Sequence, residues 1–165
     1  MGDSWPGSDA DRAVAALYGA HYRSLARIVA LLLGDGASAE EIVQDAFVSV
    51  HRAWPNLRDG DEALSYLHRA VVSRARAHGA AASAARGPAG AGPPAPGIPG
   101  AVLMAMLDGL RARQREALVL KYYAGWPDPQ IAAAMGISRH ALNAHIQRGM
   151  SALQAFAVPS PGKGA

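Results

Sequence analysis

A segment rich in glycine and proline divides the sequence into two parts. Between Gly87 and Gly100, ten of the fourteen residues are Gly or Pro. Proline fixes φ and lacks an amide hydrogen, while glycine leaves φ free, so no helix or central strand tolerates this density. We therefore predict two folded modules joined by a flexible linker. The predicted boundaries are residues 10–80 and 102–156 for the modules, 81–101 for the linker, and 1–9 and 157–165 for disordered tails.

The composition excludes several classes of protein. Half of the residues are hydrophobic, but apolar runs such as Ile28 to Leu33 are far shorter than the roughly 20 residues of a membrane span. The absence of cysteine excludes disulfides, thiolate zinc sites and cysteine nucleophiles, and the six histidines show no metal-ligand spacing. The sequence contains no phosphate loop and no nucleophile paired with a base. We expect a cytoplasmic protein that is not an enzyme, with no catalytic residue, cofactor, metal or membrane insertion.

Charge is distributed unevenly along the chain. Residues 1–50 hold three Arg against seven Asp or Glu, whereas residues 51–86 hold six Arg against three acids. Residues 101–165 hold seven Lys or Arg against three acids. This pattern suggests that the later parts bind an anion such as nucleic acid and that the acidic front contacts a different partner. Ordinary solvated surface charge explains the pattern equally well.

In the first module, apolar residues recur every three or four positions, which predicts three helices. The first stripe begins at Val14 and stops at Gly34. The second helix begins at Ser38, whose hydroxyl can cap the first turn while Glu41 bonds back, and Pro55 helps to end it. The third begins near Asp61, an acid suited to the positive end of a helix. The predicted core residues are Val14, Leu17, Tyr18, Leu25, Ile28, Leu32, Val43, Ala46, Phe47, Val50, Trp54, Leu64, Leu67 and either Ala70 or Val71.

The second module is predicted to contain one helix from Val102 to Tyr123 and then a helix-turn-helix. Asp128 is the expected N-cap of the next, short helix, because Pro129 suits the first helical position. Gly136 permits the turn and Ser138 caps the second helix. Ala132 lets the two helices cross closely, and Leu142 and Ile146 pack between them. The opposite side carries Arg139, His140, Asn143, Gln147 and Arg148. These residue types contact phosphates and base edges, although an ordinary helical hairpin with a solvated face is the alternative.

Three segments together resemble one protein family. They are "SAEEIVQDAFVSVHRAW", "ALSYLHRAVVSRARA" and, after the linker, "LRARQREALVLKYYAGWPDPQIAAAMGISRHALNAHIQRGMSAL". In this order they resemble the extracytoplasmic-function (ECF) group of the sigma-70 family of RNA polymerase sigma factors. The resemblance implies an all-α protein with a sigma-2-like helical bundle and a sigma-4-like helix-turn-helix domain. It implies core RNA polymerase (the coiled coil of the largest subunit and the flap) and promoter DNA as partners, with an anti-sigma or other regulatory protein as a further candidate.

The resemblance also assigns roles to individual residues. The minus-thirty-five element would be bound by Arg139, His140, Asn143, Gln147 and Arg148, and the minus-ten element by Arg58, Asp59, Arg69, Ser73 and Arg76. The polymerase would be bound by Glu41, Gln44, Asp45 and Val48, which lie at helical spacing beside the apolar stripe. Tyr66 is the aromatic residue closest to the minus-ten residues, and it serves equally well as a core residue.

The sequence departs from the family pattern at several positions. Ser73 stands where the family commonly has asparagine, alanine and glycine replace most of a following arginine run, Asn143 replaces a lysine, and Ala112 replaces a proline. Because phosphate affinity depends on the number of cationic contacts, DNA affinity should be reduced. The main expectation is a working sigma factor. The alternatives are a degenerate sigma-like protein that binds polymerase or another regulator without melting promoters, and an unrelated helix-turn-helix regulator.

Overall fold

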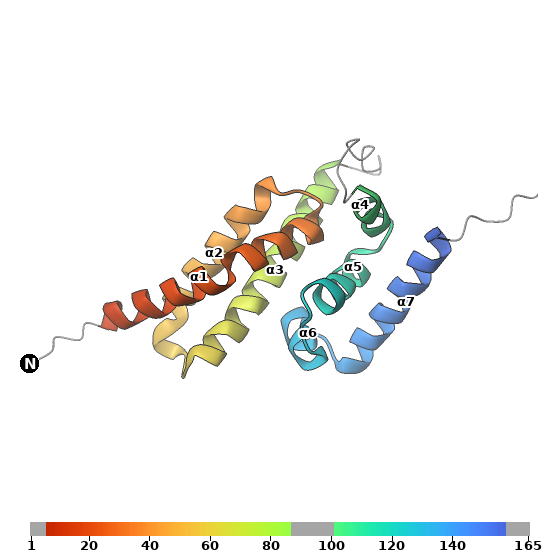
Figure 1. Cartoon of the computed structure of the whole chain (residues 1–165). Coiled ribbons are helices and arrows are strands. Elements are labelled where there is room, and N and C mark those ends of the chain that lie inside the picture. Colours follow the sequence, from red (N-terminus) through yellow and green to blue (C-terminus); the bar gives the residue numbers. More distant parts are fainter. Residues whose placement is uncertain (1–5, 87–100, 158–165) are drawn as a thin grey trace, which may run out of the picture.

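The computed structural model describes residues 6–86 and 101–157, and within these ranges every regular element is a helix (Figure 1). This confirms the predicted all-α class. Most of the predicted linker, residues 87–100, and residues 1–5 and 158–165 lie outside the described residues. The elements are α1 (Pro6–Leu33), α2 (Ala37–Ala53), the short η1 (Trp54–Asn56), α3 (Gly60–Arg86), α4 (Ala101–Asp108), α5 (Ala112–Leu118), the π-helical η2 (Val119–Tyr123), α6 (Asp128–Met135) and α7 (Arg139–Ala157).

The N-terminal module consists of α1, α2 and α3 packed around an aliphatic core. Leu25 and Ile28 of α1, Val43 and Val50 of α2 and Leu67 of α3 are each at most 2% exposed. The predicted stripes of α2 and α3 are therefore correct in position. The prediction missed Val29, which is fully buried, and it wrongly buried Tyr18, which is exposed.

Helix boundaries in this module differ from the predicted ones. Helix α1 begins at Pro6, so residues 6–9 are helical and not part of a disordered tail. Helix α3 runs to Arg86, six residues into the predicted linker. The predicted capping box at Ser38 is wrong, because α2 begins at Ala37 after the N-cap Gly36, and the side chain that accepts hydrogen bonds at this end is that of Asp35. Its carboxylate accepts hydrogen bonds from the Ala37 amide at 2.9 Å and from the Ser38 hydroxyl at 3.2 Å.

The C-terminal module contains the remaining helices. The single helix predicted from Val102 to Tyr123 is interrupted at Gly109, where α4 ends before α5 begins at Ala112. The last turn of that helix widens into the π-helix η2, which closes with a hydrogen bond from the Ala124 amide to the Val119 carbonyl. Leu118, Leu120, Ile131, Met135 and Leu142 are nearly inaccessible to solvent.

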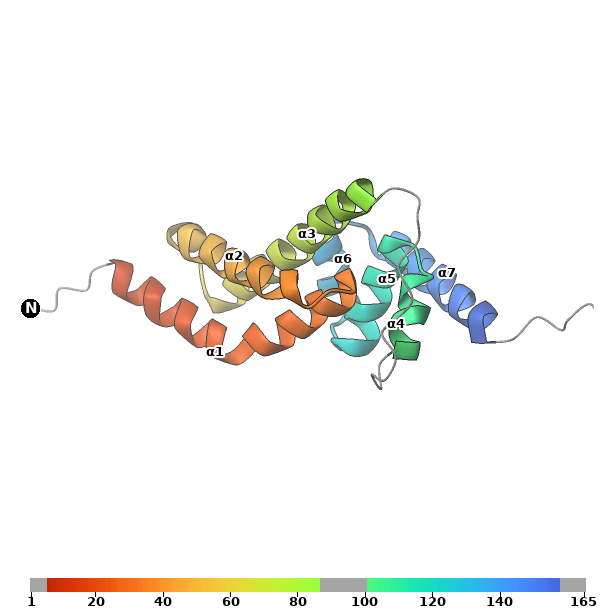
Figure 2. The same ribbon diagram turned by 90° about the horizontal axis from the view of Figure 1, so that it is seen from above.

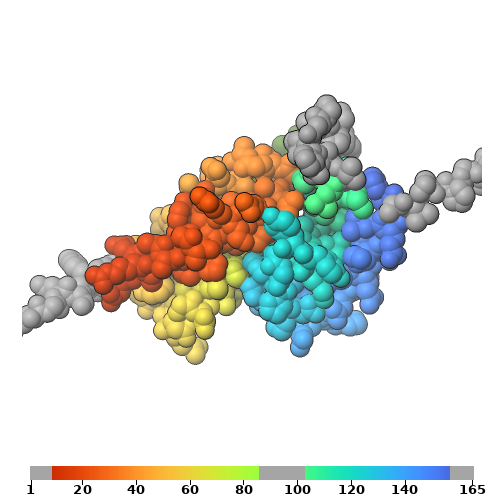
Figure 3. All heavy atoms as spheres, viewed as in Figure 1, coloured from red at the N-terminus to blue at the C-terminus, as the bar shows by residue number. Residues whose placement is uncertain are grey.

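The two modules pack against each other. Figures 1 and 2 show α3 lying along α6, with α5 and α6 between α3 and α7. Helix α1 also contacts η2 and α5, and buried residues of both modules form one continuous apolar core. In the space-filling view the two modules meet along an extended boundary (Figure 3). The sequence predicts two modules and a tether, but it does not predict this contact.

Candidate nucleic-acid and polymerase interfaces

The turn between α6 and α7 has the predicted geometry. Gly136 adopts the left-handed conformation, with φ 68° and ψ 36°. The Ile137 amide donates to the Ala132 carbonyl at 3.0 Å, and the Ser138 hydroxyl accepts the Ala141 amide at 3.1 Å, as an N-cap does. One detail of the prediction is wrong. The N-cap of α6 is Pro127 and not the predicted Asp128. The Asp128 carboxylate instead forms an ion pair with Lys121 Nζ at 3.0 Å.

The first helical turns of α7 present the polar side that the sequence indicates. Arg139, His140, Asn143, Gln147 and Arg148 are all exposed, and we call them the α7 face. Leu142 and Ile146 on the opposite side are buried, which fixes the orientation of the helix. Within the described ranges no residue of the α7 face makes a side-chain hydrogen bond or an ion pair. Its donors and acceptors are therefore free to contact a ligand.

The loop before α3 is held by its own acids. The Asp59 carboxylate accepts the Glu62 amide at 2.8 Å, and the Glu62 carboxylate accepts the Arg58 amide at 2.8 Å. This reciprocal pair caps α3 and gives Asp59 a structural role. The Arg58 side chain is 89% exposed and forms only a loose ion pair with Glu62 at 3.7 Å. Tyr66 is half-buried against the core, as expected if it is a core residue.

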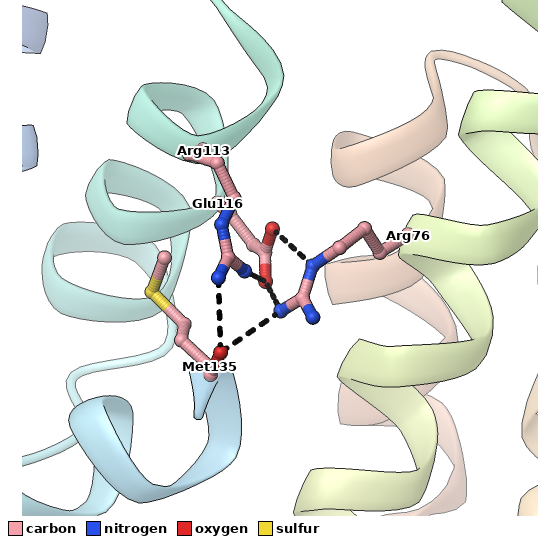
Figure 4. A network of polar contacts seen from close by, with 4 residues as sticks. All are labelled: Arg76, Arg113, Glu116 and Met135. Carbon is pink, nitrogen blue, oxygen red and sulfur yellow. Dashed lines mark hydrogen bonds and ion pairs between the residues drawn. The ribbon is translucent and has the colours of Figure 1, made fainter. Parts of the chain in front are cut away.

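The predicted minus-ten residues of α3 do not share one environment. Arg69 and Ser73 are exposed, whereas Arg76 lies at the contact between the modules and is one-third exposed. Arg76 donates through Nε and Nη2 to the two carboxylate oxygens of Glu116 on α5. Its Nη2 also donates to the Met135 carbonyl at 3.4 Å (Figure 4). The structure therefore separates Arg76 from the two exposed residues with which it was grouped.

Glu116 lies at the centre of these contacts, with a side chain that is only 5% exposed. Arg113 approaches the same carboxylate at 3.4 Å and donates to the Met135 carbonyl at 3.2 Å (Figure 4). We call Arg76, Arg113, Glu116 and the Met135 carbonyl the Glu116 network. Sequence reasoning missed Arg113 and Glu116. The available signal was the charged "RQRE" segment, which interrupts an otherwise apolar region and ends in an acid at a buried position.

Contacts of His68 and Arg115 also join the modules. The ring of His68 on α3 stacks on Trp126 with centroids 4.0 Å apart, and Gln130 Nε2 lies 2.6 Å from His68 Nδ1. Burial, followed by the charge of His21, lowers the pKa of His68 from 6.5 to about 4. Arg115 of α5 donates through Nε to the Leu31 carbonyl of α1 at 2.7 Å. The interface therefore combines apolar, aromatic and charged contacts.

The predicted polymerase-binding residues form one exposed side of α2. Glu41, Gln44, Asp45 and Val48 all face solvent, and we call them the α2 face. Val48 is 49% exposed, which is unusual for an aliphatic residue in the middle of a helix. Next to this face, Arg74 of α3 donates to the Ser49 hydroxyl, which donates in turn to the Asp45 carbonyl. An acidic side with an exposed aliphatic residue can bind a basic helical partner.

An apolar groove opens on another side of the molecule. Its lining combines Leu31 of α1 with side chains of the C-terminal module, including Leu103, Leu107, Tyr122 and Met150. Tyr122 and Leu103 remain 62% and 49% exposed. The described residues contain no helix that is both long and apolar enough to cross a membrane, and no cluster of metal-ligating side chains.

Comparison with known families excludes one alternative that the sequence leaves open, an unrelated helix-turn-helix regulator. The Sigma-70 region 2 family matches residues 17–82, and the family described as Sigma-70, region 4 matches residues 101–153. Together these regions span most of the chain. The protein is a sigma factor of the ECF group. Sigma factors are not enzymes, and they direct transcription initiation, as the sequence predicts.

Solved structures resemble the whole sigma factor and not only its parts. CnrH, solved in complex with the cytosolic domain of CnrY, is 25% identical, with a TM-score of 0.72 over 92% of this chain and 94% of that chain. The sigma factor RpoE from Bartonella quintana, solved with the anti-sigma factor NepR, shares the fold at 21% identity, with a TM-score of 0.60 over 82% and 90%. No curated protein sequence gave a significant match.

Proposed function

We propose that the α7 face binds the minus-thirty-five element of the promoter. The bare polar surface at the start of α7, directly after a well-formed turn, is the observation that supports this assignment. The N-terminal residues of the second helix of such a motif contact base edges in the major groove. Arg139 and Arg148 suit guanine or phosphate, while Asn143 and Gln147 suit adenine. Asn143 in place of the usual lysine removes one phosphate contact.

The minus-ten element is assigned to Arg58, Asp59, Arg69, Ser73 and Arg76. The exposed side chains of Arg58, before α3, and Arg69, on α3, support a role in holding the displaced single strand. Asp59 acts mainly by ordering the loop before α3 through its cap with Glu62. Arg76 joins this surface when it leaves Glu116.

The α2 face is assigned to core RNA polymerase, on the coiled coil of its largest subunit, and the C-terminal module to the flap. The exposed acids of the α2 face and the exposed Val48 support binding to a basic helical partner. Promoter-dependent transcription with purified core polymerase tests this assignment. Asp45→Lys should abolish the transcript, whereas Asp9→Lys, which makes the same charge change on an exposed residue of α1, should retain it. Equal transcript from the two variants would reject the α2 face.

We also propose that this sigma factor works in the cytoplasm and is regulated by an anti-sigma-type protein. The likeness to CnrH and RpoE, both solved with bound protein partners, supports this, as does an apolar groove with lining from both modules. An apolar face of a helix is the occupant that suits such a groove. Co-purification from the native host should recover a regulatory protein with the wild type, and Met150→Glu should release it while core polymerase remains bound. A partner retained by Met150→Glu would exclude the groove.

A further inference from the structure

The contact between the modules is built from arginines that reach the carboxyl ends of helices. Arg76 of the N-terminal module donates to the carbonyl of Met135, the last residue of α6. Arg115 of the C-terminal module donates to the carbonyl of Leu31, two residues before the end of α1. Carbonyls in a last helical turn lack helical partners and carry partial negative charge, which a cation stabilises. Each module therefore caps a helix of the other, and both ends lose a partner when the modules separate.

The Glu116 carboxylate strengthens this closed arrangement. Both of its oxygens accept from Arg76, and Arg113 lies beside one of them. A carboxylate this deeply buried is costly unless cations satisfy it, and Arg76 supplies such a cation only while the two modules are in contact. The network thus favours the state in which α3 and α5 stay together.

The same contacts occupy a group that DNA needs. In this arrangement Nε and Nη2 of Arg76 already donate to Glu116 and the Met135 carbonyl, and the Glu116 carboxylate offsets the positive charge that would attract a DNA phosphate. Meanwhile the α2 and α7 faces are exposed in the closed arrangement. We propose that the free sigma factor is self-inhibited by the Glu116 network, which withholds Arg76 from DNA until the modules separate, while leaving the polymerase-binding face accessible. This inference rests on the proposed role of Arg76 in binding the minus-ten strand.

Spin labels can report module separation directly, because the chain has no native cysteine. Ser65 on α3 and Ser151 on α7 are both exposed, so Ser65→Cys and Ser151→Cys provide one label in each module. Glu116→Gln keeps the shape of the side chain but removes the charge that holds Arg76. Asp128→Asn is the matched control. It also removes one negative charge from the C-terminal module, but it breaks the Lys121 ion pair, which lies within that module.

The proposal predicts a short label-to-label distance for the wild type and Asp128→Asn, and a longer or broader distribution for Glu116→Gln. It also predicts that the free Glu116→Gln chain binds a short mixed-sequence single-stranded DNA about tenfold more tightly than Asp128→Asn does, equivalent to about 1.4 kcal/mol. The dependence of log K on log salt should steepen by about 0.7 for each phosphate gained. Adding Arg76→Ala to Glu116→Gln should remove the gain.

Three results would overturn the inference: an unchanged distance in Glu116→Gln, an equal gain in Asp128→Asn, or a gain that survives Arg76→Ala. Failure of the proposed minus-ten role gives a different result. In that case Arg76→Ala would leave the promoter affinity of the polymerase holoenzyme unchanged, whatever the label distances show. The two ideas are therefore tested separately.

Discussion

The α7 face and the minus-ten residues of α3 (Arg69, Ser73 and Arg76) are both proposed to bind promoter DNA, yet the molecule holds them in opposite states. Within the described residues the α7 face makes no side-chain hydrogen bond or ion pair, and all five of its members are exposed. On α3, Arg69 and Ser73 are equally free, but Arg76 is ion-paired with a buried acid of the other module. One surface is ready to bind, and the other is incomplete until a contact breaks.

The position of each helix explains this difference. Helix α7 packs on its own module through Leu142 and Ile146, and at Gly149 it approaches α5 so closely that an added Cβ would lie 2.7 Å from Leu118 Cδ1. Helix α3 lies between its own module and α6. A surface on a helix that packs only on its own module stays accessible to DNA. On a helix that lies between two modules, access to DNA depends on whether the modules separate.

Leu142→Ala tests the claim that the α7 face depends on packing within its own module. Leu142 is fully buried, so its truncation should reduce the free energy of unfolding by about 2 to 5 kcal/mol. Leu103→Ala is the control, because Leu103 is 49% exposed and its truncation should cost less than about 1 kcal/mol. Urea denaturation followed by circular dichroism measures both variants. Similar midpoints for the two would contradict this packing scheme.

The pH dependence of stability tests the burial of His68 at the module contact. Its pKa falls from 6.5 to about 4 on folding, so the unfolded chain binds more protons between these values. Stability should therefore be complete above pH 6.5 and should decline by up to about 3 kcal/mol as the pH falls to 4.

His68→Gln removes this titration and provides the control. The difference in unfolding free energy between wild type and His68→Gln should shift steadily between pH 6.5 and 4. The histidines of the α7 face and its surroundings, His140 and His145, remain in both proteins, so their contribution cancels. A pH-independent difference would mean that His68 is not buried in solution.

Paired alanine substitutions compare the two DNA-binding faces directly. In the free chain, Arg139→Ala should weaken binding to minus-thirty-five duplex by about 1 to 3 kcal/mol, and Arg76→Ala should leave single-strand binding nearly unchanged. In the polymerase holoenzyme both substitutions should weaken promoter binding. Fluorescence anisotropy over a range of salt concentrations measures these effects. If Arg76→Ala weakens DNA binding by the free chain, Arg76 is not withheld.

Alanine substitution of two serines tests which side chains stabilise the starts of α2 and α7, and it has the smallest expected effect on stability. Ser138 caps α7, so Ser138→Ala should cost about 1 kcal/mol of stability. Ser38 lies in the first turn of α2 and only donates to Asp35, so Ser38→Ala should change stability by less than about 0.5 kcal/mol. Thermal unfolding compares the two. A larger loss of stability for Ser38→Ala than for Ser138→Ala would support the predicted capping box at Ser38 and contradict the hydrogen bonds of Asp35.

The local structure of each module was predictable because it depends on short-range patterns. The apolar stripes placed Val43, Phe47 and Leu67 in the core, and the Gly136–Ser138 turn followed from backbone preferences that neighbouring residues impose. The boundary errors have local causes as well. At the start of α2, the side chain of Asp35 and not that of Ser38 accepts a backbone amide. At Gly109 a helix ends although the apolar pattern continues past it.

The contact between modules was not predictable from these patterns. Arg76 and Glu116 lie forty positions apart, and neither the periodicity nor the composition pairs them. The exposure of the α2 and α7 faces follows from helical spacing next to the apolar stripes. The contacts of Arg76, by contrast, depend on how the two modules pack against each other. A buried acid such as Glu116 is the type of residue whose role appears only when its long-range partners are known.

If the Glu116 network holds the free sigma factor closed, binding to core RNA polymerase should separate the two modules. The distance between spin labels at Ser65→Cys and Ser151→Cys, measured before and after addition of core RNA polymerase, tests it most directly. The account predicts one short distance for the free chain and a longer one in the holoenzyme, with no change when Asp45→Lys prevents docking. The same distance with and without bound polymerase would contradict it.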